Sequence, residues 1–444
     1  MRPVFIILFR LYRLFSWFRY FGQRRFTGAG LVVLGSLALA GIMVPDTDNN
    51  LAYQGFTLLF FVVLLAVAFG GFFKGRFSAE RVLPRFGTVG AELRYSVLLK
   101  NLTGRTQSGL ALLEDLADPR PSFEEWLAVQ RRIRSFRFTG ARGSNPLKRA
   151  ALKDRPVPTA APGQEVEVAM QLLPLRRGVL RLSGVTVARA DPLGIYRAVR
   201  KVPAPQSLIV LPKRYPLPPI ALPGTMKYQQ GGVALAANVG RSEEFVALRD
   251  YHQGDPLRHI HWRTWAKIGK PVVKEFEDEF FVRHALVLDT FTAQPHSEAF
   301  EEAVAVAASF ACSIQTQESL LDLLFVGSES YCFTAGRGLA QADQMLEILA
   351  AVQPSGGKPF ATLEHLVLSH VSVVSGCICV FLAWDKDRRR FTEELQALGV
   401  PVLVLVVVEP GDKKQIDPGP MHADPDGFRV LECGQVEAGL AALK

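Results

Sequence analysis

Cysteine is missing from the sequence before Cys312, and the chain of 444 residues holds five cysteines in all, an odd number. A disulfide framework is therefore excluded, and this cysteine usage is typical of a reducing compartment. Motifs of catalysis are missing as well, because no Walker loop, nucleophile elbow or HExxH zinc motif occurs. The sequence thus predicts neither a cofactor nor a complete active site, and we expect a protein that is not an enzyme.

Charged residues make up only 21% of the chain, whereas hydrophobic residues make up 49%, with a mean hydropathy of +0.16. These values exclude disorder and indicate membrane and soluble parts, with room for two or three domains. The net charge of +9 is concentrated in residues 119–156, where eight Arg and two Lys accompany two Glu and one Asp. This basic insertion is predicted to meet lipid headgroups or an acidic partner, with a solvated loop as the alternative. Nucleic acid is not expected as a partner, because aromatic residues are few there and no nucleic-acid-binding module is visible.

Residues 1–25 mix aromatic and aliphatic side chains with arginines. The arginines of this segment are Arg10, Arg13, Arg19, Arg24 and Arg25. A basic amphipathic segment of this kind is typical of a helix that lies in the membrane interface, with its arginines on anionic headgroups. We predict such an interfacial segment, and a flexible arginine-rich lead-in is the alternative.

Two uncharged apolar runs, 29–44 and 56–73, fall within residues 26–76. Each approaches the roughly 20 residues that a bilayer-spanning helix needs, so we predict a two-helix transmembrane hairpin. The connector between the runs lacks Lys and Arg, whereas basic residues lie on both outer sides of the hairpin. These are Arg24, Arg25, Lys74, Arg76, Arg81 and Arg85. By the positive-inside rule, both ends and the soluble domains face the cytoplasm; signal cleavage before Gly41 is the alternative.

Residues 77–215 contain short runs of alternating polar and apolar residues, bounded by turn signals, such as 165–172 and 178–182. This pattern predicts a β-sandwich, interrupted by the basic insertion 119–156. A proline-rich stretch follows, and we assign residues 216–239 to an interdomain linker.

Residues 240–283 hold charged, aromatic and turn-forming residues at high density. Gly254-Asp255-Pro256 predicts the start of a helix, with Asp255 as its cap, and Gly269 predicts its end. Five charged side chains of this segment are expected to form a lattice of ion pairs. They are Arg249, Asp250, Asp255, Arg258 and Arg263.

Three histidines of the same segment, His252, His259 and His261, lie near Asp255 in sequence and offer a metal or acid–base site as an alternative. His259 and His261 are two residues apart on the predicted helix, however, so their side chains would point apart. A structural role is therefore favoured for them.

The run EFVALRDYHQGDPLRHIHW, followed by VVKEFEDE, resembles the signature of the bacterial domain of unknown function 58 (DUF58) family. The run RRGVLRLSGVTVARADPLGIYRA resembles the upstream segment of the same family. The positions assigned to an interaction or structural signature are Arg249, Asp250, Tyr251, Gly254, Asp255, Arg258, His261 and Trp262. The resemblance implies a protein of the bacterial cytoplasmic (inner) membrane that is associated with MoxR-type AAA+ ATPases.

Near-continuous aliphatic strands alternate with helices in residues 284–444, which predicts a parallel sheet covered on both faces. Their order resembles a von Willebrand factor A-like domain, and such domains commonly bind a divalent cation through Asp-x-Ser-x-Ser after the first strand. In this sequence Asp289 is kept, but Phe291 and Ala293 stand at the serine positions. Asp385 follows another strand and is expected to approach Asp289. Because a hard cation needs several oxygen ligands, we interpret Asp289 and Asp385 as a degenerate metal-site position and expect no metal.

The predicted fold class is α+β multidomain, with a transmembrane helical hairpin, a β-sandwich and an α/β parallel-sheet von Willebrand factor A-like domain. We predict a membrane-anchored interaction or adaptor protein, with membrane lipids as partners of the basic segment and the hairpin. The family resemblance implies that it works with a MoxR-type AAA+ ATPase in envelope-related assembly or stress handling. A magnesium-dependent adhesion module is one alternative. An enzyme built on the Asp, Arg and His cluster of the signature segment is the other.

Overall fold

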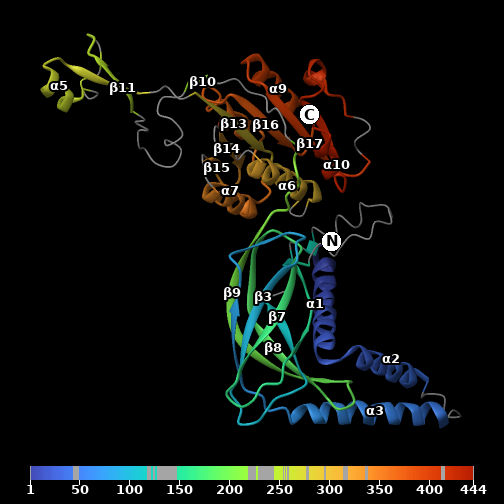
Figure 1. The fold of residues 1–444 in the computed structure, drawn as a ribbon. Coiled ribbons are helices and arrows are strands. Elements are labelled where there is room, and N and C mark those ends of the chain that lie inside the picture. Colours follow the sequence, from blue (N-terminus) through green and yellow to red (C-terminus); the bar gives the residue numbers. More distant parts are fainter. Residues whose placement is uncertain are drawn as a thin grey trace. The chain divides into compact units, whose positions relative to one another are not determined.

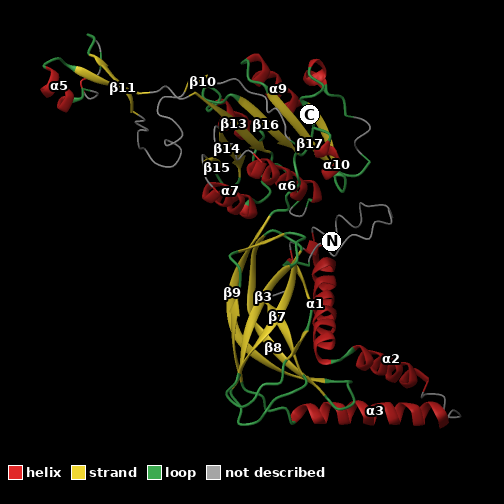
Figure 2. Cartoon of the chain, in the orientation of Figure 1, coloured by secondary structure: helices red, strands yellow, loops and turns green. Residues whose placement is uncertain are grey.

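The structure, a computed structural model, forms two compact units, Met1–Leu211 and Pro212–Lys444. Each unit is described by itself (Figures 1 and 2). The residues that the structure describes are 2–43, 50–117, 122–123, 126–127, 148–218, 227–228, 245–253, 255, 257, 260–276, 280–294, 297–313, 319–335, 339–411 and 416–443.

Three helices begin the first unit: α1 (Arg2–Arg25), α2 (Gly28–Met43) and α3 (Asn50–Gly71). Within α3, residues Ala52–Gly71 are long and apolar enough, by length and composition alone, to cross a bilayer. The first predicted span forms α2, whose 16 residues fall short of the roughly 20 that a spanning helix needs. One of the two predicted spans is thus supported, and α2 packs alongside α3 where Gly41 faces the ring of Phe56.

Two sheets complete the first unit. One has the order β1-β3-β7-β5 and the other the order β2-β9-β8-β4-β6. Their strands are β1 (Phe77–Val82), β2 (Phe86–Thr88), β3 (Leu93–Asn101), β4 (Leu110–Leu116), β5 (Ala150–Leu152), β6 (Arg155–Val157), β7 (Glu165–Pro174), β8 (Gly178–Ala190) and β9 (Arg197–Leu211). In β7 every second side chain is buried, and these residues share one core with strands of the other sheet. The alternation in the sequence therefore arises because two sheets pack face to face.

A mostly parallel sheet dominates the second unit. Its order is β15-β14-β13-β16-β17-β18, and the short β10 pairs with β13. The strands are β10 (Lys227–Tyr228), β13 (Phe280–Leu288), β14 (Ser319–Val326), β15 (Ser330–Ala335), β16 (Gly376–Phe381), β17 (Val402–Val408) and β18 (Phe428–Glu432). All neighbours along the path are parallel except β15, an antiparallel edge strand. The strand order reverses between β13 and β16, which is where ligand sites form in open α/β sheets.

Helices cover both faces of this sheet, as its continuous apolar strands require. They are α6 (Glu298–Ser313), α7 (Leu339–Ala351), α8 (Ala361–Leu368), α9 (Lys386–Ala397), η4 (Gly419–Ala423) and α10 (Val436–Ala441). On one face, α8 and α9 form a core with Ala285 and Val287 of β13. The neighbouring Leu286 and Leu288 are fully buried on the opposite face, which α6 covers.

The proline-rich stretch before β10 is anchored to this unit. Tyr215 is buried, and its backbone N–H donates to Ser309 Oγ of α6 at 2.8 Å. Its hydroxyl donates to Glu302 Oε2 at 2.5 Å. Two strands and a helix lie between β10 and β13: β11 (Phe245–Asp250), α5 (Trp262–Ile268) and β12 (Val272–Phe276). We call β11, α5, β12 and the described residues between them the signature module. Residues 216–239 thus include β10 and part of the anchored stretch, and their other positions from 219 onward lie outside the described residues.

Candidate functional site

An ion pair between Arg249 and Asp255 organises the signature module. Arg249 belongs to β11, and its guanidinium donates two hydrogen bonds to the Asp255 carboxylate. Nη1 lies 2.7 Å from Oδ2, and Nη2 lies 2.8 Å from Oδ1. The backbone N–H of His252 donates to the same carboxylate at 2.9 Å. The Arg249 hydrogen bonds, and then the His252 N–H, lower the pKa of Asp255 to about 2. The pair therefore closes the loop that follows β11.

The helix expected to start at Asp255 begins later, at Trp262, and its N-cap residue His261 makes no side-chain cap. The carboxylate of Asp255 is engaged by Arg249, and Ile260 pairs with Val273 of β12 as an isolated bridge. The expectation that Asp255 caps this α-helix is therefore wrong, because the bidentate guanidinium of Arg249 takes the same oxygens. Of the Gly254-Asp255-Pro256 pattern itself, only Asp255 lies within the described residues. The expected end at Gly269 is found, with φ of 72° and its N–H on the carbonyl of Trp265.

Two of the remaining described signature residues hydrogen-bond to the start of β12. Tyr251 donates its backbone N–H to Pro271 at 3.0 Å, and His261 donates its backbone N–H to Val272 at 2.8 Å. Asp250 ends β11 with an exposed side chain. Trp262 stacks on Trp265, with ring centroids 5.1 Å apart. Gly254 and Arg258 lie outside the described residues, as do Pro256 and His259.

The two described histidines of the segment do not meet at Asp255 as an acid–base site would require. His252 Nδ1 lies 3.0 Å from Arg249 Nη1, whereas His261 Nδ1 lies 2.6 Å from Thr264 Oγ1. Both Nδ1 atoms therefore contact a residue only three positions away in the chain. In the described part of the module, Asp255 has an orienting role and no nucleophile beside it.

The second candidate position lies at the carboxyl end of β13, where the strand order reverses. Asp289 is fully buried there, and its carboxylate accepts the backbone N–H groups of Phe291 at 2.9 Å and Leu382 at 3.0 Å. Arg388 Nε donates to Asp289 Oδ2 at 2.7 Å, and Arg388 Nη1 donates to Asp385 Oδ2 at 2.5 Å. The structure therefore brings Asp289 and Asp385 together through one guanidinium.

Arg388 is itself only 5% exposed, and its guanidinium carbon lies 4.7 Å from the ring centroid of Phe360. Burial alone would lower the pKa of Arg388, but the carboxylates of Asp289 and Asp385 more than offset it, so that the pKa is raised. The side chain is thus a permanent cation between two acids. Sequence reasoning missed it, although Asp385 and Arg388 stand three residues apart at the start of α9, where Asp385 is the N-cap.

These residues do not fit a divalent cation. The ring of Phe291 packs against Phe360 with centroids 5.8 Å apart, and Thr290 Oγ1 donates to the carbonyl of Val326 at 2.5 Å. The oxygens of Asp289 already serve N–H donors and a guanidinium, whereas magnesium requires several uncommitted oxygen ligands. Among all the residues that the structure describes, no three His, Cys, Asp or Glu side chains gather in a way that would hold a metal ion.

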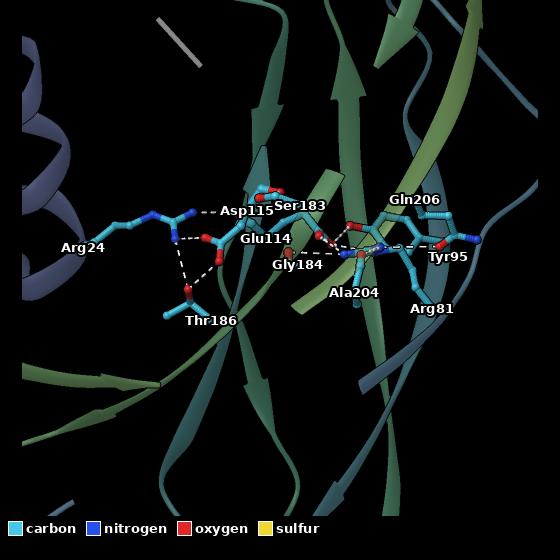
Figure 3. A network of polar contacts seen from close by, with 10 residues as sticks. All are labelled: Arg24, Arg81, Tyr95, Glu114, Asp115, Ser183, Gly184, Thr186, Ala204 and Gln206. Atoms are coloured by element: carbon cyan, nitrogen blue, oxygen red, sulfur yellow. Dashed lines mark hydrogen bonds and ion pairs between the residues drawn. The ribbon is translucent and has the colours of Figure 1, made fainter. Parts of the chain in front are cut away.

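The first unit holds a buried polar network that the sequence did not reveal (Figure 3). Glu114 of β4 accepts hydrogen bonds from Arg81 Nη2 and from the Tyr95 hydroxyl, both at 2.5 Å. Burial raises the pKa of Glu114, and the Arg81 charge opposes that shift. The adjacent Asp115 accepts from Arg24 of α1 and, at 2.7 Å, from the Thr186 hydroxyl. This network therefore connects α1 to both sheets.

Fold and sites together define a multidomain α/β protein with one long apolar helix near its N-terminus and with signature residues that brace a small module. Residues 247–425 of the chain match the family model described as "Protein of unknown function DUF58", and this is the family to which the signature pointed. The resemblance of the chain to the DUF58 family is thereby confirmed, over residues 247–425.

The chain is 25% identical over 214 residues to a Bacillus subtilis (strain 168) protein described as "Uncharacterized protein YeaD". The match covers 47% of this chain and 52% of the relative, so it spans about half the length of that protein.

Solved structures resemble this chain only weakly. The CARDB domain of a Pyrococcus furiosus protein, in complex with di-metal ions, is 13% identical, with 31% of this chain and 93% of that chain covered and a TM-score of 0.18. A GH20 exo β-N-acetylglucosaminidase of Vibrio harveyi is 8% identical, with 79% and 70% covered and a TM-score of 0.16. Neither likeness bears on fold or function at these TM-scores.

Proposed function

We propose that this chain is a membrane-anchored interaction or adaptor protein that works with a MoxR-type AAA+ ATPase in envelope-related assembly or stress handling. The observation that carries the proposal is the exposure of α5. No side chain of this helix is buried, and Trp262 remains 63% exposed although it stacks on Trp265. Exposed tryptophan beside cationic residues, here Arg263 and Lys267, is typical of the centre of a protein–protein contact.

The Arg249–Asp255 pair supports this function because it gives the module a fixed shape. A two-stranded sheet with one short helix has little core of its own, so ordering must come from polar contacts of this kind. The signature residues are then used to display a surface instead of to perform chemistry. The identity of the partner as a MoxR-type ATPase comes from the family resemblance.

Membrane anchoring is supported by α3 and by the packing of α2 beside it. The proposed location is the bacterial cytoplasmic (inner) membrane, with a multi-pass hairpin and the soluble domains on the cytoplasmic side. The charges that argue for this orientation need revision, since Arg24 is paired with Asp115 and Arg81 with Glu114. The orientation therefore depends on the other basic residues after α3, of which Lys74 is one.

A von Willebrand factor A-like fold for the second unit is part of the same proposal. The sheet order, the antiparallel edge strand β15 and the position of Asp289 at the end of the central β13 favour it. Magnesium-dependent adhesion is disfavoured because Arg388 already pairs with Asp289 and Asp385. An enzyme that uses the signature cluster is disfavoured because Asp255 is engaged by Arg249.

The test is a pull-down from detergent-solubilised native membranes with three variants of the full chain. Trp262→Ala removes the exposed aromatic side chain, and Asp255→Ala removes the ion pair. Tyr331→Ala is the matched control, because Tyr331 is an exposed aromatic residue that also stacks on a neighbour, Phe325, but outside the signature module.

We expect an AAA+ ATPase to co-purify with the wild type and with Tyr331→Ala, and to be at least tenfold depleted with Trp262→Ala. Equal recovery with Trp262→Ala and wild type would refute α5 as the contact. Absence of any ATPase from the wild-type sample would refute the adaptor function itself.

A further inference from the structure

Helix α1 has one face docked on the first unit. The ring of Phe9 lies 5.5 Å from that of Trp126, and the ring of Tyr12 lies 5.9 Å from it. Trp126 is buried in this contact, and Phe123 adds an edge contact to Phe9 at 5.3 Å. The inner face of α1 therefore packs its aromatic side chains against Phe123 and Trp126.

The C-terminal end of α1 is fixed as well. Arg24 pairs with Asp115, and Arg25 Nη1 donates to the Tyr196 hydroxyl at 2.8 Å. Two of the arginines expected on lipid headgroups are thus held by protein groups, which corrects that part of the prediction. Phe26 continues the attachment through an isolated bridge to Tyr196.

All three N-terminal helices contact the turn of residues 191–196, which joins β8 to β9. The Asp191 carboxylate fixes it by accepting the N–H groups of Ile195 at 2.7 Å and Tyr196 at 2.6 Å. A Cβ on Gly30 of α2 would lie 2.1 Å from the carbonyl oxygen of Ile195, and a Cβ on Gly70 of α3 would lie 2.7 Å from the Tyr196 ring. The turn therefore holds the ends of α1 and α3 and the start of α2 at one place.

The outer face of α1 is apolar and exposed. Its large side chains recur at helical spacing on the side away from Phe9 and Tyr12. They are Ile7, Leu11, Leu14, Phe15 and Phe18, and Phe15 is 74% exposed. Soluble surfaces seldom leave so many large apolar groups together without a cover. The exposed Arg10, Arg13 and Arg19 lie on the same helix.

The direction of α1 indicates what covers this face. In Figure 1, α1 runs along the sheets of the first unit, whereas α2 and α3 run crosswise at its foot. A helix that lies crosswise to a bilayer-spanning α3 runs along the bilayer surface. We infer that the outer face of α1 is seated in the interface of an anionic phospholipid bilayer, with Arg10, Arg13 and Arg19 at the headgroups and the turn of residues 191–196 fixing its depth. This inference rests on the proposed membrane anchoring.

Trp17 offers a native reporter, since it is 46% exposed and belongs to α1. The full chain is placed in nanodiscs of phosphatidylethanolamine and phosphatidylglycerol, with or without acyl chains brominated near the headgroup, because bromine quenches tryptophan only at contact. The signal of Trp17 is the difference between wild type and Trp17→Phe. Phe15→Glu tests the outer face, and Val82→Glu, at an exposed apolar position on β1, is the matched control.

We expect brominated lipid to reduce the Trp17 signal at least twofold in wild type and in Val82→Glu, and much less in Phe15→Glu. An unquenched Trp17 in a chain retained by the nanodisc would overturn the inference while leaving membrane anchoring intact. Crosslinking between copies through Phe15→Cys, with no quenching, would identify a second copy as the cover and would also overturn it. Failure of the chain to enter nanodiscs would instead refute the anchoring.

Discussion

Arg388 and Asp289 form a buried ion pair, with Nε 2.7 Å from Oδ2, at the point where the strand order of the second unit reverses. The two residues are 99 positions apart in the chain. In an open α/β sheet this point usually receives a ligand. Here a side chain of the protein occupies it, and several measurable properties follow from that relationship and from the other contacts described above.

Arg388→Met should destabilise the second unit strongly. The substitution keeps an apolar stem near Phe360 but leaves the fully buried Asp289 without its cation, and breaking a buried pair in this way costs about 3–5 kcal/mol. The free energy of unfolding is measured by urea denaturation followed by tryptophan fluorescence. Arg390→Met is the control, because the side chain of Arg390 is 56% exposed in its pair with Glu364, whereas that of Arg388 is buried. Similar losses for the two variants would contradict a special role for Arg388.

Magnesium should not raise the melting temperature of the wild type, because the guanidinium of Arg388 already neutralises Asp289 and Asp385. Arg388→Ala removes that cation and leaves two carboxylates facing the space, so its melting temperature should rise when magnesium is added. Differential scanning fluorimetry with magnesium or with EDTA distinguishes the two cases. A magnesium effect in wild type that disappears in Asp289→Ala would show that the site binds metal after all.

Acid should loosen the signature module at a low and defined pH. The Arg249 hydrogen bonds lower the pKa of Asp255 to about 2 in the folded chain, below the ordinary value of 3.8. A depressed folded pKa contributes stability that is complete above about pH 4 and is lost as the pH falls through about 2. Emission of Trp262 and Trp265 against pH follows the transition, with the other tryptophans replaced by Phe. In Arg249→Lys the midpoint of the transition should move to higher pH. An unchanged midpoint would show that protonation of Asp255 does not cause the transition.

Gly30→Ala should destabilise the first unit, because its Cβ would lie 2.1 Å from the Ile195 carbonyl oxygen and neither backbone can yield freely. Overpacking of this kind costs about 1–3 kcal/mol. Gly35→Ala in the same helix meets no atom within 4 Å and should be neutral or slightly stabilising, since alanine favours a helix. Thermal unfolding in detergent, followed by circular dichroism, compares the pair. A stable Gly30→Ala chain would mean that α2 is not seated on the turn.

The parts that sequence reasoning predicted were those with a local signal. Every second residue of β7 is buried over its whole length, so the period in the sequence is sufficient to find it. The end of α5 at Gly269 was also predictable, because it depends only on the glycine itself and its positive φ. These features need no knowledge of distant partners.

The parts that were missed depend on contacts that only the fold creates. The expected lattice of ion pairs does hold Arg249 and Asp255 together. Asp255 also carries a good capping side chain, however, and nothing local shows that the pair with Arg249 takes the place of the cap. Arg388 lies in a run of basic residues at the start of α9, where a solvated face is the ordinary expectation. Asp289 lies beside Arg388 because β13 and β16 are neighbours in the sheet. That strand order cannot be read from the order of residues along the chain.

The attachment of the N-terminal helices to the turn of residues 191–196 also dictates an order of events during synthesis. Thr27 at the start of α2 donates to the Ile195 carbonyl, yet the two residues are 168 positions apart. The ribosome therefore releases α1, α2 and α3 long before their seat exists. Under the proposed membrane anchoring, α3 enters the bilayer first, and α1 reaches its final position only when the later strands have been made and the sandwich has closed.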